Sequence, residues 1–70
     1  DRIKRNSGII SKLTDNNFYI GKDKYLINKE IFSDLYELYE NICEITVIGY
    51  KMNCKNSDID IFKVIGIYIE

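Results

Sequence analysis

The sequence predicts a small all-β domain with one helix, in the order of three strands, a helix and two strands. Runs rich in β-branched and aromatic residues alternate with Gly, Asn and Asp turn signals, which is typical of short strands. Residues 28–41 instead have apolar residues at helical spacing. The 70 residues, 46% of them hydrophobic, suffice for one compact core.

The first hairpin is expected between residues 8–14 and 18–20. Asp15 and Asn16 between them tolerate the positive φ of a tight turn. A two-residue loop there places Lys12 opposite Tyr19 on the outer face. The inward set in that register is Ile9, Leu13, Phe18 and Ile20.

A second two-residue turn is expected at Gly21 and Lys22, with glycine at its first position. This turn places Lys24 beside Tyr19. The outer face of the two hairpins should therefore carry a row of Lys12, Tyr19 and Lys24.

The helix is predicted from Asn28, a suitable N-cap, to Asn41, which can end it in a left-handed conformation. Glu30 suits the positive first turn. The predicted buried stripe is Ile31, Leu35, Leu38 and Ile42. Three tyrosines with strand or helical spacing are expected in the core or at its rim, namely Tyr25, Tyr36 and Tyr39.

Two longer strands are predicted at residues 43–52 and 60–69, joined by a loop. Gly49 and Gly66 within them mark a bend or a close approach of backbone. The last strand is apolar at successive positions, so both of its faces need cover. Either the helix and the N-terminal segment cover the second face, or it is a protein-docking patch. The patch would be Ile65, Ile67 and Ile69, or the alternate set Val64 and Tyr68.

Charge and segment boundaries set the expected context. Residues 1–6 should be a flexible lead-in or linker, and residues 7–70 the domain, excised from a larger protein. No apolar run is long enough for a membrane span. Cys43 and Cys54 fit no zinc motif, and free thiols favour a cytoplasmic, reducing compartment. The net charge of −1 argues against strong non-specific binding to phosphate backbones.

Three strands, a helix and two strands is the element order of the five-stranded OB barrel. An SH3-like barrel, or an α+β sheet with the helix on one face, is the alternative. The chain also resembles the cold-shock-like domains over residues 7–69. "SGIISKLTDNNFYI" stands where that family has a strand beginning Gly-x-hydrophobic, a turn and a Gly-Phe-Gly-Phe-Ile-like motif, and "DKYLINKEIF" where it has an Asp-hydrophobic-Phe-hydrophobic-His motif. The longer helix is similar to that of divergent cold-shock-like domains appended to eukaryotic RNA helicases, including those of the piRNA pathway.

The resemblance implies that unpaired bases stack on outward aromatic residues of the second and third strands. Tyr19 matches one such position. Asn17, Leu26 and Asn28 stand where the family has a second aromatic residue, a Phe and the His. Because each stacked base contributes about 1–3 kcal/mol, these losses predict weak binding.

We therefore expect a non-catalytic module that binds single-stranded RNA or DNA weakly. The alternative is a module that docks on a partner protein or on neighbouring domains. The chain has no His for acid–base catalysis, and Asp58 and Asp60 are too few for a metal site, so no enzyme activity, cofactor or metal is expected. The candidate nucleic-acid contacts are Lys12, Tyr19, Lys22, Lys24, Tyr50, Lys51 and Lys55.

Overall fold

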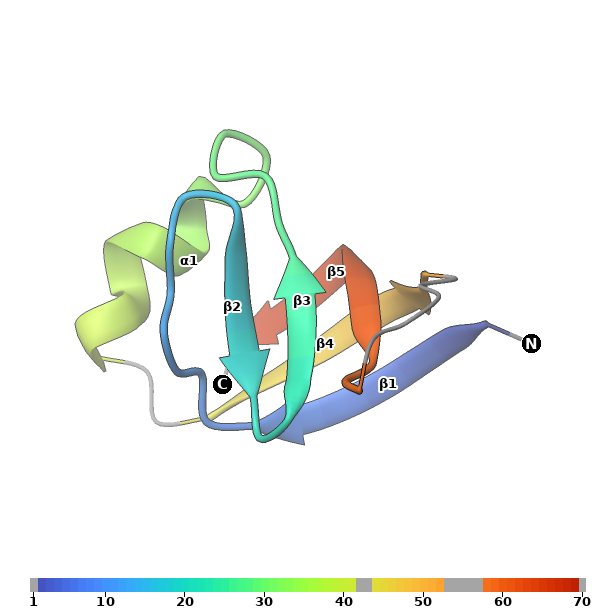
Figure 1. Cartoon of the computed structure of the whole chain (residues 1–70). Coiled ribbons are helices and arrows are strands. Elements are labelled where there is room, and N and C mark those ends of the chain that lie inside the picture. Colours follow the sequence, from blue (N-terminus) through green and yellow to red (C-terminus); the bar gives the residue numbers. More distant parts are fainter. Residues whose placement is uncertain (1, 42–43, 53–57, 70) are drawn as a thin grey trace.

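The computed structural model describes residues 2–41, 44–52 and 58–69 and shows a five-stranded mixed sheet with one short helix (Figure 1). This arrangement confirms the predicted order of elements. No helix in the described ranges has the length and apolar character needed to cross a membrane. The elements are β1 (Ile3–Gly8), β2 (Asn17–Ile20), β3 (Asp23–Leu26), α1 (Ser33–Leu38), the 3-10 turn η1 (Tyr39–Asn41), β4 (Ile45–Lys51) and β5 (Ile61–Ile69).

The strands lie in the order β1-β4-β5-β3-β2. β3 and β5 are parallel, and the other neighbours are antiparallel. β1 and β2 are the two ends of this order, so the strands do not form a closed sheet. One isolated bridge, Ser11 with Tyr19, joins the chain after β1 to β2 through two backbone hydrogen bonds of 2.8 Å. Figure 1 shows α1 at the opposite end of the molecule from the N-terminus.

The first strand begins at Ile3, inside the segment expected to be a flexible lead-in. Residues 3–6 pair with β4, so that expectation is wrong for them. The inward side of this strand is polar, so its sequence lacks the apolar alternation that predicts a strand. Asn6 donates a hydrogen bond to the Tyr25 hydroxyl at 3.0 Å, and Lys4 lies 4.0 Å from the Asp23 carboxylate.

The β2–β3 hairpin has the predicted two-residue turn. Gly21 has φ +61°, and Tyr19 lies opposite Lys24. The register predicted for the preceding hairpin is wrong by one residue, because Ser11 rather than Lys12 pairs with Tyr19. Lys12 follows in the left-handed region at φ +53°, which ends regular pairing there.

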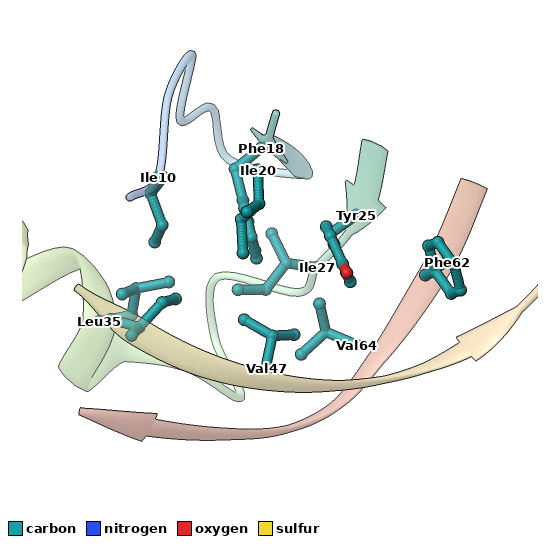
Figure 2. Packing of buried hydrophobic residues seen from close by; sticks show 10 residues of the cluster. Ile10, Phe18, Ile20, Tyr25, Ile27, Leu35, Val47, Phe62 and Val64 are labelled. Atoms are coloured by element: carbon teal, nitrogen blue, oxygen red, sulfur yellow. The ribbon is translucent and has the colours of Figure 1, made fainter. Parts of the chain in front are cut away.

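The core lies between the β2–β3 hairpin and the sheet of β4 and β5 (Figure 2). Phe18, Tyr25 and Phe62 are cross-strand partners on β2, β3 and β5, so their rings meet in one row. The ring centroids are 5.3 Å apart for Phe18–Tyr25 and 5.2 Å for Tyr25–Phe62, with nearly parallel planes. The remaining buried hydrophobic residues are Ile10, Ile20, Ile27, Leu35, Ile45, Val47 and Val64.

The inward set predicted for the first hairpin is confirmed for Phe18 and Ile20, which are buried. Leu13 packs against the core while remaining partly exposed. The prediction for Ile9 is wrong, because Ile9 is exposed and its neighbour Ile10 is buried instead. The one-residue shift at Ser11 changes which residue after β1 points inward.

The helix starts later than predicted. Asn28 does act as a cap, but for the turn before α1: its side-chain oxygen accepts hydrogen bonds from the backbone N–H groups of Glu30 at 2.9 Å and Ile31 at 3.3 Å. The predicted stripe is only partly buried. Leu35 is buried, whereas Ile31 is 72% and Leu38 46% exposed. Ile42 lies outside the described residues.

The helical face that contacts the core is rotated by about one residue from the predicted stripe. Phe32, Tyr36 and Tyr39 pack against the buried cluster. The Tyr36 hydroxyl donates a hydrogen bond to the Thr14 carbonyl, so this tyrosine packs its ring and keeps its polar end satisfied at the rim. The expectation that Tyr25, Tyr36 and Tyr39 belong to the core or its rim is confirmed.

β5 changes its inward face part-way along. The register with β4 shifts by one residue between Ile48 and Gly49, which leaves Ile65 without a cross-strand partner. Before this bulge Phe62 and Val64 are buried, and after it Ile67 and Ile69 pack against the core. The predicted docking set is therefore split, since Ile65 is exposed and the other two isoleucines face inward.

Gly49 confirms the predicted close approach of backbone. A Cβ atom there would lie 3.0 Å from the Phe62 Cβ and 3.2 Å from the Tyr25 ring. At Gly66 a Cβ would make an ordinary contact of 3.9 Å with Ile48. The glycine on β4 makes room for the aromatic row, and the glycine on β5 does not.

Candidate nucleic-acid interface

The outer face of the β2–β3 hairpin brings Tyr19 together with two lysines. The Lys12 Nζ lies 5.4 Å from the centroid of the Tyr19 ring. Lys24 is the cross-strand partner of Tyr19 on β3. Tyr19 is half-buried, so part of its ring is accessible. The predicted row of Lys12, Tyr19 and Lys24 is confirmed as a structural feature, although Lys12 reaches it from a left-handed turn and not from a strand.

The outer face continues across β3 and β5 to β4. Leu26 pairs with Lys63 on β5, and Lys63 pairs with Tyr50 on β4. Side chains of such partners point to the same side of a sheet. Lys63 and Tyr50 are both exposed. The structure therefore connects Tyr50 to the hairpin face through Lys63.

Sequence analysis missed Lys63. Its signal was the alternation of "IFKV", in which a charged residue stands between the two inward residues Phe62 and Val64. The apolar character of the rest of this strand drew attention away from it. Lys22 was predicted and lies exposed in the hairpin turn next to β3.

Lys51 does not join this face. It is paired with Phe62, so it lies on the opposite side of β4 from Tyr50. Its Nζ is 3.6 Å from the Asp60 carboxylate, and its backbone N–H donates to the Arg2 carbonyl at 2.8 Å. The prediction from the sequence put Tyr50 and Lys51 in one contact surface, although consecutive residues of a strand point to opposite faces. Lys55, also predicted, lies outside the described residues.

The positions at which the chain departs from the cold-shock-like pattern have structural roles. Asn17 and Leu26 are cross-strand partners in the outer row that leads to Lys63, and both are half-buried. The side chain of Asn28 is occupied by the turn before α1. Tyr19 and Tyr50 are thus the aromatic residues that this face offers among the described residues.

The cations of the face are not neutralised by nearby acids. Three ion pairs are found among the described residues, Lys4–Asp23, Lys29–Asp15 and Lys51–Asp60. Lys12, Lys22, Lys24 and Lys63 belong to none of them. Residues 28–44, by contrast, contain one lysine and five carboxylates, Glu30, Asp34, Glu37, Glu40 and Glu44. The charge of the molecule is therefore separated into a basic sheet face and an acidic helical segment.

Burial raises the pKa of the Tyr25 hydroxyl beneath this face. The hydrogen bond from Asn6 opposes that shift, and the negative charge of Asp23 adds to it. This hydroxyl is therefore protonated at neutral pH and is a fixed part of the core rather than a reactive group.

A second pair of a cation and a tyrosine lies on the outer face of β1, β4 and β5. The Arg5 guanidinium is 5.9 Å from the centroid of the Tyr68 ring, and Tyr68 is 57% exposed. No group of acidic or Cys side chains within residues 2–41, 44–52 and 58–69 is arranged to hold a metal ion.

Comparison with known proteins gives no relative: no family model, curated protein or solved structure matches this chain.

Proposed function

We propose that this domain is a non-catalytic module that binds single-stranded nucleic acid weakly, RNA in the first place, through the outer face of β2, β3 and β5. The observation that carries the proposal is the Tyr19 ring between Lys12 and Lys24. A partly exposed ring beside unpaired cations suits a base and its flanking phosphates, since the base stacks on the ring and the phosphates attract the ammonium groups.

The assignment includes an OB-type, cold-shock-like interpretation of the fold, which the arrangement of the strands supports. The helix lies between the third and fourth strands, β3 runs parallel to β5, β1 pairs with β4, and Ser11 after β1 bridges to Tyr19 on β2. An OB fold is a partly open Greek-key barrel that binds oligonucleotides on the face of its second and third strands. In this reading Tyr19 and Lys24 occupy the customary binding face.

The arrangement also predicts how a strand of RNA would engage. Lys12 now covers the Tyr19 ring in an exposed cation–π contact, which stabilises by only about 0.5–1 kcal/mol. An incoming base replaces the ammonium on the ring, and the flexible lysine moves to the adjacent phosphate. Lys24 and Lys63 extend the phosphate path toward Tyr50. With one central platform, the affinity should be low.

The test is a fluorescence anisotropy titration of a fluorescein-labelled 12-nucleotide oligouridylate in low salt. Tyr19→Ala should weaken binding by at least about fivefold, the lower limit for one lost stacking platform. Tyr68→Ala is the matched control, because Tyr68 also lies beside a cation, but at the other end of β5 from Lys63 and away from Tyr19. Lys12→Glu should weaken binding and lower the dependence of log K on log salt by about 0.7 or more.

Equal losses for Tyr19→Ala and Tyr68→Ala would show that binding is not centred on the Tyr19 ring. No measurable binding of the oligouridylate at low salt would overturn nucleic-acid binding itself and leave protein docking as the function of the domain.

A further inference from the structure

The edge of β5 that faces α1 has no strand partner for most of its length. β3 pairs with β5 only at residues 61–63, and then leaves toward α1. Within residues 64–69 all except Ile65 are paired with β4 on one side, but no described strand pairs with this segment on the other. An exposed strand edge presents unpaired N–H and C=O groups and is a template for an added strand.

An apolar groove runs beside this free edge. One hollow of about 180 Å³ is lined by Ile31, Phe32, Asp34, Leu35, Ile67 and Ile69. A second hollow of about 400 Å³ shares Ile31 and Phe32 with it and extends to Leu26 and Lys63. The groove thus follows β5 from the point where β3 departs toward the end of the strand.

The turn before α1 and the first part of α1 present apolar side chains to the same place. Ile31, Leu35 and Leu38 have the spacing of a buried helical face, yet only Leu35 is buried. Ile31 and Leu35 line the groove, whereas Leu38 lines neither hollow. A strand added to the edge of β5 would cover Ile31, which the sequence pattern predicts to be buried but which is 72% exposed.

We infer that the edge of β5 and the groove beside α1 form a docking site for an extended peptide segment of a partner protein. The segment would add to β5 along residues 64–69, with apolar side chains at alternate positions in the groove. A Lys or Arg would lie at the end near Asp34, because the surrounding helical segment is acidic. A second copy of this chain suits the site less well, since pairing of two β5 edges would place two acidic helical segments at one junction.

The groove and the nucleic-acid face meet at Leu26 and Lys63, which line the second hollow and also belong to the outer sheet face. Away from this junction they differ in charge, because Asp34 and the carboxylates of residues 28–44 repel phosphates whereas Lys12 and Lys24 attract them. Variants at Ile31 and Asp34 therefore test the docking proposal, and variants at Lys12 and Tyr19 test nucleic-acid binding.

The test uses a labelled octapeptide of alternating valine and threonine with two lysines at one end. Its affinity for the domain is measured by fluorescence anisotropy. Ile31→Glu and Asp34→Lys should each weaken binding at least about tenfold. Ile9→Glu is the matched control, because Ile9 is also 72% exposed but lines neither hollow, and it should leave the affinity unchanged.

Two further probes report the binding mode. On binding, backbone amides within residues 64–69 should gain protection from hydrogen exchange, since an added strand pairs with them. A peptide with proline at its central valine should bind at least about tenfold more weakly, and one with glutamate in place of the lysines should also bind more weakly.

Binding that is unchanged by Ile31→Glu, or by proline in the peptide, would overturn the proposal. So would a failure of all three peptides to bind at millimolar concentration. Sedimentation of the domain as a dimer that Ile31→Glu dissociates would overturn the proposed occupant in favour of a second copy of the chain.

Discussion

At the end of the sheet that carries the β2–β3 hairpin, three aromatic rings stack across three neighbouring strands, and Lys4 lies 5.6 Å above the ring of Phe62. At the end that carries α1, Leu35 is buried beside Phe32, Tyr36 and Tyr39, which pack against the core, but Ile31 and Leu38 remain exposed. No strand among the described residues covers the edge of β5 there. The rings of the first end are fully buried, whereas the predicted apolar stripe of the second is buried only at Leu35.

The two ends also differ in charge. The cations of the hairpin face have no acidic partners among the described residues, while residues 28–44 are rich in carboxylates. The proposed nucleic-acid face is therefore rich in lysines, whereas the proposed peptide groove lies beside the acidic helical segment, and the two meet at Lys63.

The largest expected effect separates buried from exposed positions on α1. Leu35→Ala should lower the free energy of unfolding by about 3 kcal/mol, because it leaves a cavity between α1 and the sheet. Leu38→Ala should cost less than about 1 kcal/mol, since that side chain is 46% exposed. Urea denaturation of both variants measures the difference. Comparable losses would mean that the helix is rotated relative to the structure described.

The two strand glycines, Gly49 and Gly66, test whether the aromatic end of the sheet is packed more tightly than the other end. Gly49→Ala should destabilise by about 2 kcal/mol, because its Cβ would crowd the Phe62 Cβ and the Tyr25 ring. Gly66→Ala should be neutral or stabilise by about 0.5 kcal/mol, because its Cβ has room and the substitution reduces the entropy of the unfolded chain. Thermal unfolding of the pair is the measurement. A larger loss at Gly66 would contradict the view that the aromatic end is the more tightly packed one.

The Tyr25 hydroxyl connects β1 to the aromatic row, and its removal should have a moderate effect. Tyr25→Phe loses the hydrogen bond from Asn6 and should cost about 1 kcal/mol at neutral pH.

The same variant should alter the response to alkaline pH. Burial raises the pKa of Tyr25 in the folded state. As the pH rises, the unfolded chain therefore loses this proton first, near the ordinary tyrosine pKa of about 10. The stabilisation by this group is complete below that pH and is lost as the pH rises beyond it. The free energy of unfolding, measured by denaturation, should therefore fall less between pH 8 and pH 11 for Tyr25→Phe than for the parent chain. Equal losses would contradict a buried, protonated hydroxyl.

The smallest expected effect on stability is at Lys12, and it should oppose the effect on binding. Lys12→Gly removes a side chain from a left-handed backbone conformation and should stabilise the domain by about 0.5 kcal/mol. The same change removes the ammonium beside Tyr19, so it should weaken binding of the oligouridylate. A variant that is both less stable and unchanged in binding would refute the roles assigned to this lysine.

Local signals were sufficient to predict the hairpin face. The turn at Gly21 and the alternation of β2 and β3 place Tyr19 and Lys24 opposite each other without knowledge of any distant contact. The same holds for the existence of β4 and β5. Lys63 and the true direction of Lys51 were also within reach, because strand alternation defines both.

The remaining features depend on partners that lie far away in the sequence. β1 is unrecognisable alone because its inward Lys4 and Asn6 are compensated by Asp23 and Tyr25 on another strand. Which face of α1 is buried depends on the open edge of β5. Which face of β5 points inward depends on a register shift against β4. None of these can be read from periodicity, since periodicity reports the pattern of one element and not the position of its neighbours.

Ile65 has no partner on β4, and at this residue the alternation of inward and outward side chains along β5 shifts by one position. Upstream of it, odd-numbered positions such as Lys63 face the solvent; downstream, odd-numbered positions such as Ile67 face the interior. If β5 paired regularly with β4 and had no bulge, this alternation would continue unchanged, Ile67 would face the solvent and Tyr68 would point into the core. The bulge, rather than the composition of β5, therefore decides which side chains of its last part face the solvent.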